Sequence, residues 1–421
     1  MDFIKTPVKG MRDQLPSDVL LREHVMGMIR DTYRKYGFTE IETPAIEHIE
    51  NLTNKQGGEN EKLIFKILKR GRDLEKVVQA GGTDFADIGL RYDLTVPLAR
   101  YYAANANQLS SPFKALQIGS VWRADKPQKG RFRQFTQCDI DILGDGSAMA
   151  EIELIAATSE MLTKIFAEVG IRDFTVHVSD RRILRGMAKY AGFREEDYGN
   201  VFIILDKLDK IGADGVTEEL RKAGYAENAI QKYVSIFADG AEGKSAAEFC
   251  AFLSADDLDP AVAANLEMIL SCVQAMISDN VRVVFDPTLV RGMGYYTGTI
   301  FECTIDEYSF SIAGGGRYDK MSGKYSGTDV PACGFSIGFE RIITILKDHL
   351  TEDALADGEK VAILAEKGVT PEQLVALFTR AQELRAAGKI VTVQTMKKNV
   401  RRQIELLEAE GYREIEKVYK T

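Results

Sequence analysis

The sequence lacks the features that mark membrane-spanning and secreted proteins. No stretch of its 421 residues approaches the roughly 18 consecutive apolar residues that a membrane-spanning helix needs. The opening residues, MDFIKTPVKGMRDQLP, contain neither the apolar core nor the small-residue cleavage site of a secretion signal. We therefore expect a cytoplasmic protein without membrane contact.

Cysteine and histidine are both scarce. The five cysteines are an odd number and include no C-x-x-C pair, which argues against a disulfide framework and against a zinc knuckle. The four histidines, at positions 24, 48, 177 and 349, are far apart, so a histidine-based metal site would need ligands from distant segments. We predict reduced thiols and no metal held by the protein's own side chains.

The formal net charge of −9 argues by itself against a nucleic-acid partner, because neutralising phosphates requires clustered Lys and Arg. The segment from 114 to 133 has the opposite balance, with one acid, Asp125, among six basic residues: Lys114, Arg123, Lys126, Lys129, Arg131 and Arg133. Aromatic side chains alternate with these charges at Trp122, Phe132 and Phe135. Nucleotide binding by guanidinium groups and rings, or a charged surface hairpin, explains this segment equally well on its own.

The length allows two or three domains, and the apolar periodicity suggests where they lie. It predicts a helix over 17–36, capped by Ser17 and ended by Gly37, and an antiparallel hairpin over 113–143. Helical periodicity dominates 180–280, with breaks at Gly212, Gly240 and Asp259-Pro260. We divide the chain into a catalytic core of two parts, 1–179 and 281–350, a helical insertion, 180–280, and a small α/β domain, 359–421.

Three glycine-containing segments are candidate parts of a site. The motif GGGRYD at 314–319 allows close backbone approach to a ligand, but it also fits a tight bend and does not match the phosphate-loop pattern. In GFSIGFER at 334–341, the glycine spacing suits a helix packed on a sheet, and Arg341 is either an exposed residue or a phosphate ligand. In RGMGYYTGTIFE at 291–302, a strand would point the two tyrosines to opposite faces, so only one would line a pocket.

Together these segments resemble the histidyl-tRNA synthetases, which are class II aminoacyl-tRNA synthetases. The resemblance runs from KGMRDQLP at 9–16 to the tail domain. RADKPQKGRFRQFTQCDID at 123–141 is similar to motif 2, LVRGMGYYTGT at 289–299 to the histidine-specific motif, and the segment 334–341 to motif 3. The helix over 17–36 with Pro44 is similar to motif 1, which in this family forms the dimer interface. The resemblance implies an α+β fold, in which an antiparallel-sheet catalytic core carries a helical insertion and a small C-terminal α/β domain.

The resemblance also implies roles for single residues. Arg123 would bind the α-phosphate and the substrate carboxylate, and Arg291 would neutralise charge at the reacting groups; these are the expected catalytic residues. The remaining ATP-binding residues would be Arg131 at the phosphates, Phe135 stacked on adenine and Arg341 at the γ-phosphate. The remaining histidine-binding residues would be Asp93, Thr95 and Gln137 at the α-ammonium group, and Asp141, Tyr296 and Tyr318 at the imidazole.

The implied reaction is histidine–tRNA ligation. ATP, accompanied by Mg²⁺, and histidine form histidyl-adenylate, and the histidyl group then passes to tRNA(His) on a homodimeric enzyme. Fixed positive charge lowers the barrier of such a reaction, and a pocket that pairs both ring nitrogens selects histidine. Two alternatives are a histidine-sensing regulatory subunit of ATP phosphoribosyltransferase and an amino-acid-activating paralogue with another acceptor.

Two features depart from the family pattern. The usual R-G-L-D-Y-Y is R-G-M-G-Y-Y here, so Gly294 replaces an aspartate near Arg291, which alters the local charge and rigidity. The tail after about residue 360 is shorter than the family's anticodon-binding domain, which normally continues through a further strand and helix.

Overall fold

The computed structural model describes residues 3–53, 59–127, 131–238, 244–292, 294–308, 310–349 and 358–421. Two compact units make up the chain, Met1–Gln14 with Val25–Leu346 and Leu15–His24 with Lys347–Thr421. The helix break predicted at Gly240 lies outside the described residues.

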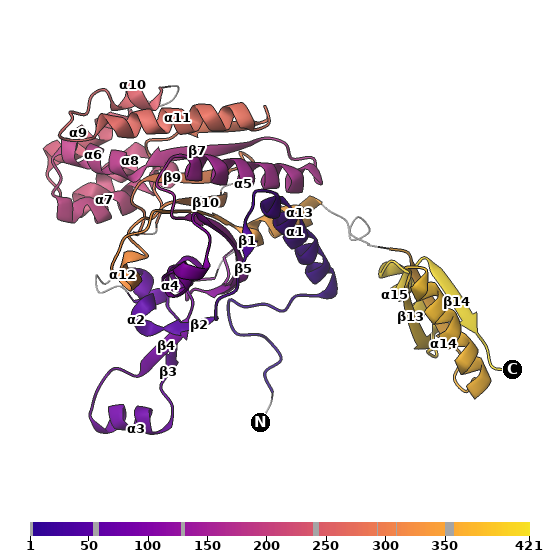
Figure 1. The fold of residues 1–421 in the computed structure, drawn as a ribbon. Helices are drawn as coiled ribbons and strands as arrows, with labels where there is room; N and C mark the ends of the chain where they lie inside the picture. The colour runs from indigo at the N-terminus through magenta and orange to yellow at the C-terminus, as the bar shows by residue number, and fades with distance from the viewer. Residues whose placement is uncertain are drawn as a thin grey trace. The chain divides into compact units, whose positions relative to one another are not determined.

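The larger unit is built on an eight-stranded sheet (Figure 1). Its strand order is β1 (Thr39–Glu40), β5 (Phe113–Trp122), β6 (Gln134–Leu143), β11 (Ala332–Ile337), β10 (Ser311–Arg317), β9 (Thr299–Thr304), β7 (Phe174–Asp180) and β8 (Val281–Phe285). Neighbouring strands from β5 to β7 are antiparallel, and the edge pairs β1/β5 and β7/β8 are parallel. The α+β class and the antiparallel core expected from the sequence are confirmed.

The basic segment forms the predicted hairpin. Strands β5 and β6 pair from Phe113 opposite Leu143 to Trp122 opposite Gln134. Because side chains alternate along a strand, Gln137, Asp139 and Asp141 of β6 point to one face while the even-numbered neighbours face the other.

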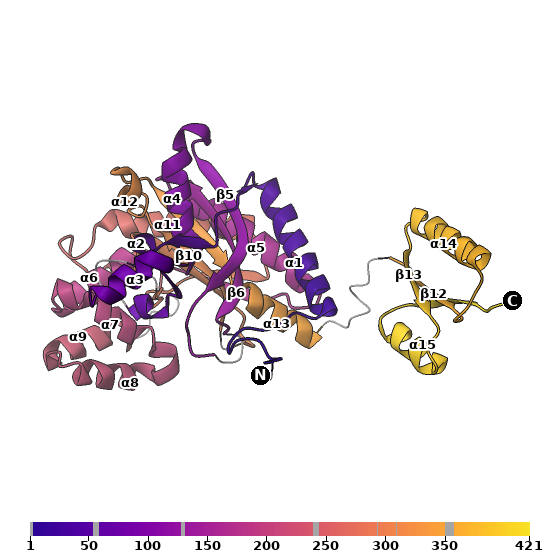
Figure 2. The same cartoon turned by 90° about the horizontal axis from the view of Figure 1, so that it is seen from below.

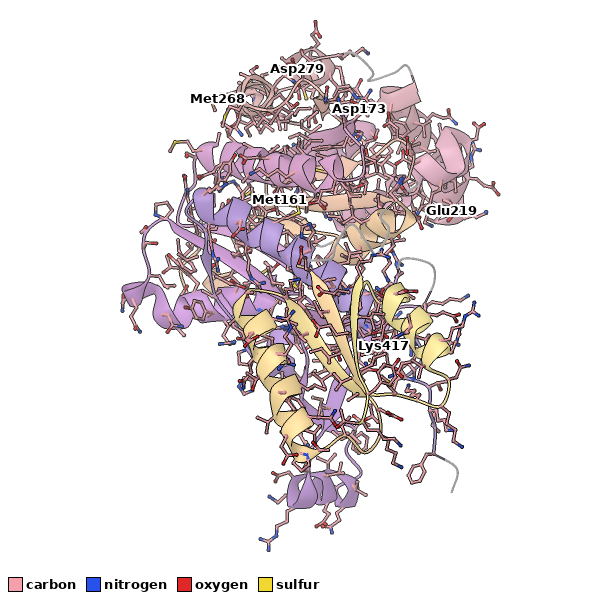
Figure 3. The ribbon with its side chains drawn as sticks, turned by 90° about the vertical axis from the view of Figure 1, so that its right-hand side faces the viewer. Met161, Asp173, Glu219, Met268, Asp279 and Lys417 are labelled. Carbon is pink, nitrogen blue, oxygen red and sulfur yellow. The ribbon has the colours of Figure 1, made fainter. Side chains whose placement is uncertain are left out.

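Helices cover the second face of the sheet. These are α1 (Pro16–Lys35), α5 (Met149–Ala167) and α11 (Pro260–Met276). Tyr33 of α1 is fully buried and its hydroxyl lies 3.3 Å from that of Thr158 on α5. Met161 of α5 is also fully buried, whereas Met268 of α11 is 48% exposed on the outer surface (Figure 3). This layer leaves the first face available for a site.

The insertion between β7 and β8 is helical, as expected. It contains α6 (Arg181–Ala191), α7 (Tyr198–Leu205), α8 (Leu208–Lys222), α9 (Glu227–Ala238), α10 (Ala246–Cys250) and α11, with a 3-10 turn at Glu195–Asp197. These helices form one cluster beside the β7 end of the sheet (Figures 1 and 2). Two of the predicted breaks are confirmed. Gly212 has non-helical angles inside α8, and Asp259 caps α11 by accepting the N–H of Ala261, with Pro260 at the first turn.

The first face of the sheet carries smaller elements. A three-stranded antiparallel sheet combines β2 (Ile46–His48), β4 (Ala86–Leu90) and β3 (Lys66–Leu68). The short helices are α2 (Ile49–Leu52), α3 (Gly71–Gln79), α4 (Thr95–Asn105) and α12 (Gly323–Ser326), with 3-10 turns at Glu59–Leu63 and Ala106–Gln108. The last helix of this part is α13 (Phe339–His349).

The C-terminal part is a small α/β sheet, also as expected. Its three strands are parallel, in the order β13 (Ile390–Thr395), β12 (Lys360–Ala365) and β14 (Glu414–Val418), and are connected through α14 (Pro371–Ala386) and α15 (Val400–Ala409). Thr370 and Gln373 form a capping box that starts α14. In the described part of the chain, no helix has the length and apolarity to cross a bilayer.

Candidate active site

One cavity of about 1070 Å³ brings together residues from many separate segments. It lies on the face of the sheet that α5 and α11 leave open. All eleven residues expected at the site line it: Asp93, Thr95, Arg123, Arg131, Phe135, Gln137, Asp141, Arg291, Tyr296, Tyr318 and Arg341. Their individual roles stay predictions, but the convergence meets the first requirement of a shared site.

Arg123, directly after β5, is positioned by a hydrogen bond and two aromatic rings. Its Nε donates to the carbonyl oxygen of Tyr92 at 3.1 Å. Its guanidinium carbon lies 4.4 Å from the ring centre of Tyr92 and 5.1 Å from that of Phe135. The Nε contact and the two rings orient the group while its terminal nitrogens remain available for an anion.

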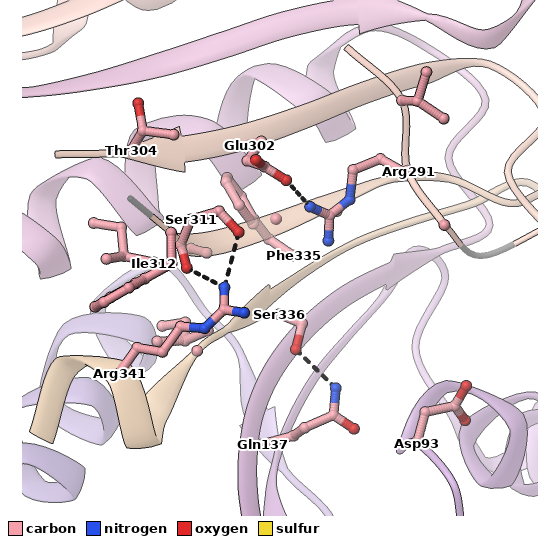
Figure 4. Close-up of a pocket in the computed structure, with 18 of the residues that line it drawn as sticks. Asp93, Gln137, Arg291, Glu302, Thr304, Ser311, Ile312, Phe335, Ser336 and Arg341 are labelled. Atoms are coloured by element: carbon pink, nitrogen blue, oxygen red, sulfur yellow. Dashed lines mark hydrogen bonds and ion pairs between the residues drawn. The ribbon is translucent and has the colours of Figure 1, made fainter. Parts of the chain in front are cut away.

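Arg341 and Arg131 add positive charge to the same cavity. Nη1 of Arg341 donates to the carbonyl oxygen of Ser311 at 2.5 Å and lies 3.1 Å from its hydroxyl (Figure 4). Burial lowers the pKa of Arg341, and the charges of Arg131, Arg291 and Arg123 lower it further. Arg131 itself is half-exposed and lies 3.8 Å from Asp125. A bound polyanion would relieve the mutual repulsion among these groups.

Arg291 is seated on the glycine motif of β10. A Cβ added to Gly314 would lie 2.5 Å from Cζ and from Nη1 of Arg291, so the missing side chain creates the space for this guanidinium. Glu302 of β9 forms an ion pair with it (Figure 4). Burial is the largest single effect on Arg291 and lowers its pKa, but the charge and hydrogen bond of Glu302 together with Tyr296 and Tyr295 outweigh it, so the pKa is raised. The close approach expected of GGGRYD is therefore made by a side chain of the protein, within a strand rather than at a bend.

Buried carboxyl groups also line the cavity. Asp141 is 2% exposed, and its Oδ1 accepts a hydrogen bond from the Tyr318 hydroxyl at 2.5 Å. Burial raises the pKa of Asp141 to about 7, although the Tyr318 hydrogen bond acts against the rise. Burial also raises the pKa of Asp93, whose Oδ1 accepts the N–H of Val96 at the start of α4. A ligand with N–H donors would stabilise these carboxylates in their charged form.

Two expectations about local structure are wrong. Tyr295 and Tyr296 lie in a turn before β9 rather than in a strand, their ring centres are 4.8 Å apart, and both line the cavity. The alternation rule that excluded one of them therefore does not apply. Gly334 lies in β11 opposite Asp141 and Gly338 follows that strand, so the pair is not a helix-packing motif. Gly334 instead leaves space for the Asp141 carboxylate.

Other wall residues were not expected from the sequence. Asp139 lies between Gln137 and Asp141 on the same face of β6, and the two-residue alternation could have identified it. Ser336 accepts a hydrogen bond from Nε2 of Gln137 at 3.0 Å (Figure 4). Ser336 and Glu302 enter the wall through the pairing of β11 and β9 with β10, for which the sequence carries no local signal. Among the described side chains, no group of three or more His, Cys, Asp or Glu could hold a metal ion.

The glycine that departs from the family motif sits in open space. No heavy atom lies within 4 Å of a Cβ built on Gly294. The backbone therefore does not require glycine at this position for steric reasons.

Comparison with known proteins gives consistent results. A family model described as histidyl-tRNA synthetase matches residues 10–342. A histidine–tRNA ligase of Leifsonia xyli subsp. xyli is 44% identical over 417 residues, covering 97% of this chain and 94% of the relative. A probable histidine–tRNA ligase of Tropheryma whipplei is 40% identical and covers 96% and 94%.

Solved structures share the fold. The histidyl-tRNA synthetase of Nostoc sp. PCC 7120 has a TM-score of 0.75 at 28% identity, covering 98% of this chain and 91% of the other. A Bacillus halodurans C protein described as an ATP phosphoribosyltransferase regulatory subunit/histidyl-tRNA synthetase has a TM-score of 0.76 at 21% identity and covers both chains fully. At that identity the second likeness concerns the fold alone.

Proposed function

The chain belongs to the histidyl-tRNA synthetase family, and from that membership we propose that it activates histidine with ATP and transfers the histidyl group to tRNA(His). It is an aminoacyl-tRNA ligase, and the relatives that are 40–44% identical over nearly its whole length favour charging over a regulatory role. The retained arginines 123, 131 and 341 agree with this reading, because a subunit that only senses histidine does not need a triphosphate site.

The observation that carries the proposal is that one cavity holds both a set of arginines and a set of buried acceptor groups. Activation brings the histidine carboxylate onto the α-phosphate of ATP, so two anions must approach each other. Arg123 and Arg291 neutralise this charge and hold the reacting groups in line, which lowers the barrier mainly by positioning and electrostatics. Arg131 and Arg341 bind the outer phosphates, and Phe135 stacks on the adenine.

Histidine binds at the acceptor groups of the cavity. Asp93, Thr95 and Gln137 accept or orient the α-ammonium group, and Asp141 pairs with the imidazole together with Tyr296 and Tyr318. A site with buried polar groups rejects analogues that leave those groups unpaired by roughly 10⁴-fold or more. Other amino acids are excluded on that basis.

The proposal also covers the metal ion, the cellular compartment, the oligomeric state and the domains. Mg²⁺ would accompany ATP and would supply positive charge that shields the phosphates. The enzyme works in the cytoplasm, a reducing compartment in which its five free cysteines persist as thiols. It forms a homodimer through α1, where Val19 and Leu20 expose 44% and 39% of their surface in the single chain. Residues 1–179 and 281–350 form the catalytic core, 180–280 the insertion, and 359–421 an anticodon-binding-like domain.

Two assays test the proposal in sequence. Histidine-dependent exchange of pyrophosphate into ATP measures activation, and attachment of labelled histidine to tRNA(His) measures transfer. Folded protein that shows no exchange at saturating ATP and histidine refutes the ligase. Exchange without attachment to tRNA(His) instead supports an activating paralogue with another acceptor.

A further inference from the structure

Asp139 is a buried carboxylate in the cavity to which neither the reaction nor the family motifs assign a role. Its side chain is 3% exposed and lines the cavity wall. Strand pairing places it opposite Gln117 of β5 and Ser336 of β11. It therefore occupies the middle of the sheet, between the residues expected at the ammonium group and those expected at the imidazole.

The charges around Asp139 do not neutralise it. Burial is the largest effect that raises its pKa, and the charges of Asp141 and Asp93 raise it further. Arg123 lowers the pKa, but its Nε is bonded to the Tyr92 carbonyl and its guanidinium carbon lies 4.4 Å from the Tyr92 ring centre. Burial and these negative neighbours favour the neutral form of this carboxyl in the free protein, so a cationic ligand beside it would stabilise the charged form.

The side chains next to Asp139 form hydrogen bonds with other groups of the protein. Gln117 donates to the carbonyl oxygen of Leu94 at 3.2 Å, and Arg91 donates to the carbonyl oxygens of Thr43 and Ser120. The Ser336 hydroxyl bonds to the Asp139 carboxyl. Among the described residues, Oδ1 of Asp139 still has no partner.

Two further unpaired acceptors flank this oxygen on the same strand. Oε1 of Gln137 and Oδ2 of Asp141 also lack hydrogen-bond partners among the described residues. Residues two apart on a strand are about 6.8 Å apart, so one ammonium group between Gln137 and Asp139 can reach both. An ammonium group offers three N–H donors and a positive charge, whereas a neutral ring nitrogen offers one donor.

We propose that Asp139 is a further substrate ligand, which accepts a hydrogen bond from the α-ammonium group of histidine beside Gln137. This inference rests on the proposed function and extends it, because it divides recognition along β6. Asp139 and Gln137 bind the amine, and Asp141 binds the ring. The negative charge at Asp139 makes the amine a condition of tight binding and thereby a determinant of specificity.

Binding of three ligands to the Asp139→Asn variant tests this division by calorimetry. Histidine carries amine, ring and carboxylate; histamine lacks the carboxylate; 3-(imidazol-4-yl)propionate lacks the amine. Loss of a charge-assisted hydrogen bond predicts roughly 10- to 100-fold weaker binding of histidine and histamine. Binding of the propionate should stay within about twofold of wild type, because no ammonium group is present to lose.

Two comparison variants calibrate the result. Asp141→Asn should weaken all three ligands because each contains the ring, and Asp84→Asn should weaken none because Asp84 is exposed and outside the cavity. Thermal unfolding gives an independent readout. Replacing the buried carboxyl of Asp139 by an amide should leave the melting temperature equal or higher, whereas loss of a structural carboxyl would lower it.

Each outcome decides between the alternatives. Equal weakening of all three ligands, unchanged binding of all three, or a lower melting temperature without ligand selectivity overturns the assignment of Asp139 to the amine. In each of these cases, wild-type protein that still binds histidine leaves the ligase proposal intact. Wild-type protein that binds no histidine removes the ligase proposal as well.

Discussion

The Arg291 guanidinium packs against Gly314, so adding one methyl group at Gly314 tests the catalytic arrangement. In Gly314→Ala the new Cβ would lie 2.5 Å from Cζ and Nη1 of Arg291 and 2.6 Å from Nη2, where ordinary contacts are 3.4–4 Å. The guanidinium must therefore retreat by about 1 Å, a displacement that can cost roughly 10²-fold in rate. This corresponds to about 3 kcal/mol of transition-state stabilisation.

The fold should tolerate the same substitution. The atoms nearest to the new methyl group are the far end of a flexible side chain, and Gly→Ala restricts the unfolded chain. We expect the melting temperature to stay within about 3 °C of wild type, while pyrophosphate exchange falls about 100-fold and histidine binding changes little. Gly294→Ala is the matched control, because it adds a methyl group in open space and should leave exchange within about twofold.

A double-mutant cycle shows whether the methyl group acts through Arg291. Arg291→Ala should slow activation much more than it weakens histidine binding, since its charge matters most in the transition state. Adding Gly314→Ala to that variant should cause no further loss. Exchange by Gly314→Ala within about threefold of wild type, or additive losses in the double variant, would refute the reasoning.

Three further predictions concern charge and space. The pKa of Asp141 is about 7 in the fold, against an ordinary 3.8. Its protonated form therefore stabilises the free protein below about pH 4, and this contribution of about 4 kcal/mol is lost as pH rises through 7. The difference in denaturation midpoint between wild type and Asp141→Asn should therefore change between pH 5 and 8, and a constant difference contradicts the prediction. Gly334→Ala would place a Cβ 2.9 Å from Cγ of Asp141, so the KM for histidine should rise tenfold or more while the KM for ATP is unchanged. Equal changes in the two KM values in steady-state assays would contradict this prediction. Arg317→Ala removes the 2.6 Å ion pair to the buried Glu151 and should cost about 3–5 kcal/mol in denaturant unfolding, whereas Arg282→Ala, from an exposed pair, should cost at most about 1 kcal/mol.

Residues inside continuous motifs were the most predictable part of the site. Arg123 and Gln137 belong to one hairpin, whose strands alternate regularly and whose turn composition is recognisable. The same alternation of side chains along β6 also places Asp139 on the cavity face, although the family motif assigns it no role. Local pattern therefore identifies a face of a strand even where a family motif assigns no role.

Predictions were wrong where a residue spacing was assigned to the wrong type of secondary structure. Tyr295 and Tyr296 sit in a turn, where adjacent side chains can share a face. Gly334 resembled half of a helix-packing pair, but strand pairing places it opposite Asp141. Spacing alone cannot distinguish these cases, because the same interval between residues has different directions in a helix, a strand and a turn.

The amino-acid sequence by itself predicted the helical insertion through its periodicity, and through its resemblance to a known family it predicted the class of fold and the eleven residues that share one cavity. Only the tertiary structure decided that Gly314 seats Arg291, that Gly334 makes room for Asp141 and that Glu302 faces the arginine. These contacts arise from the register between β9, β10, β11 and β6, whose residues are far apart along the chain. Register is a property of paired strands, so no single segment encodes it.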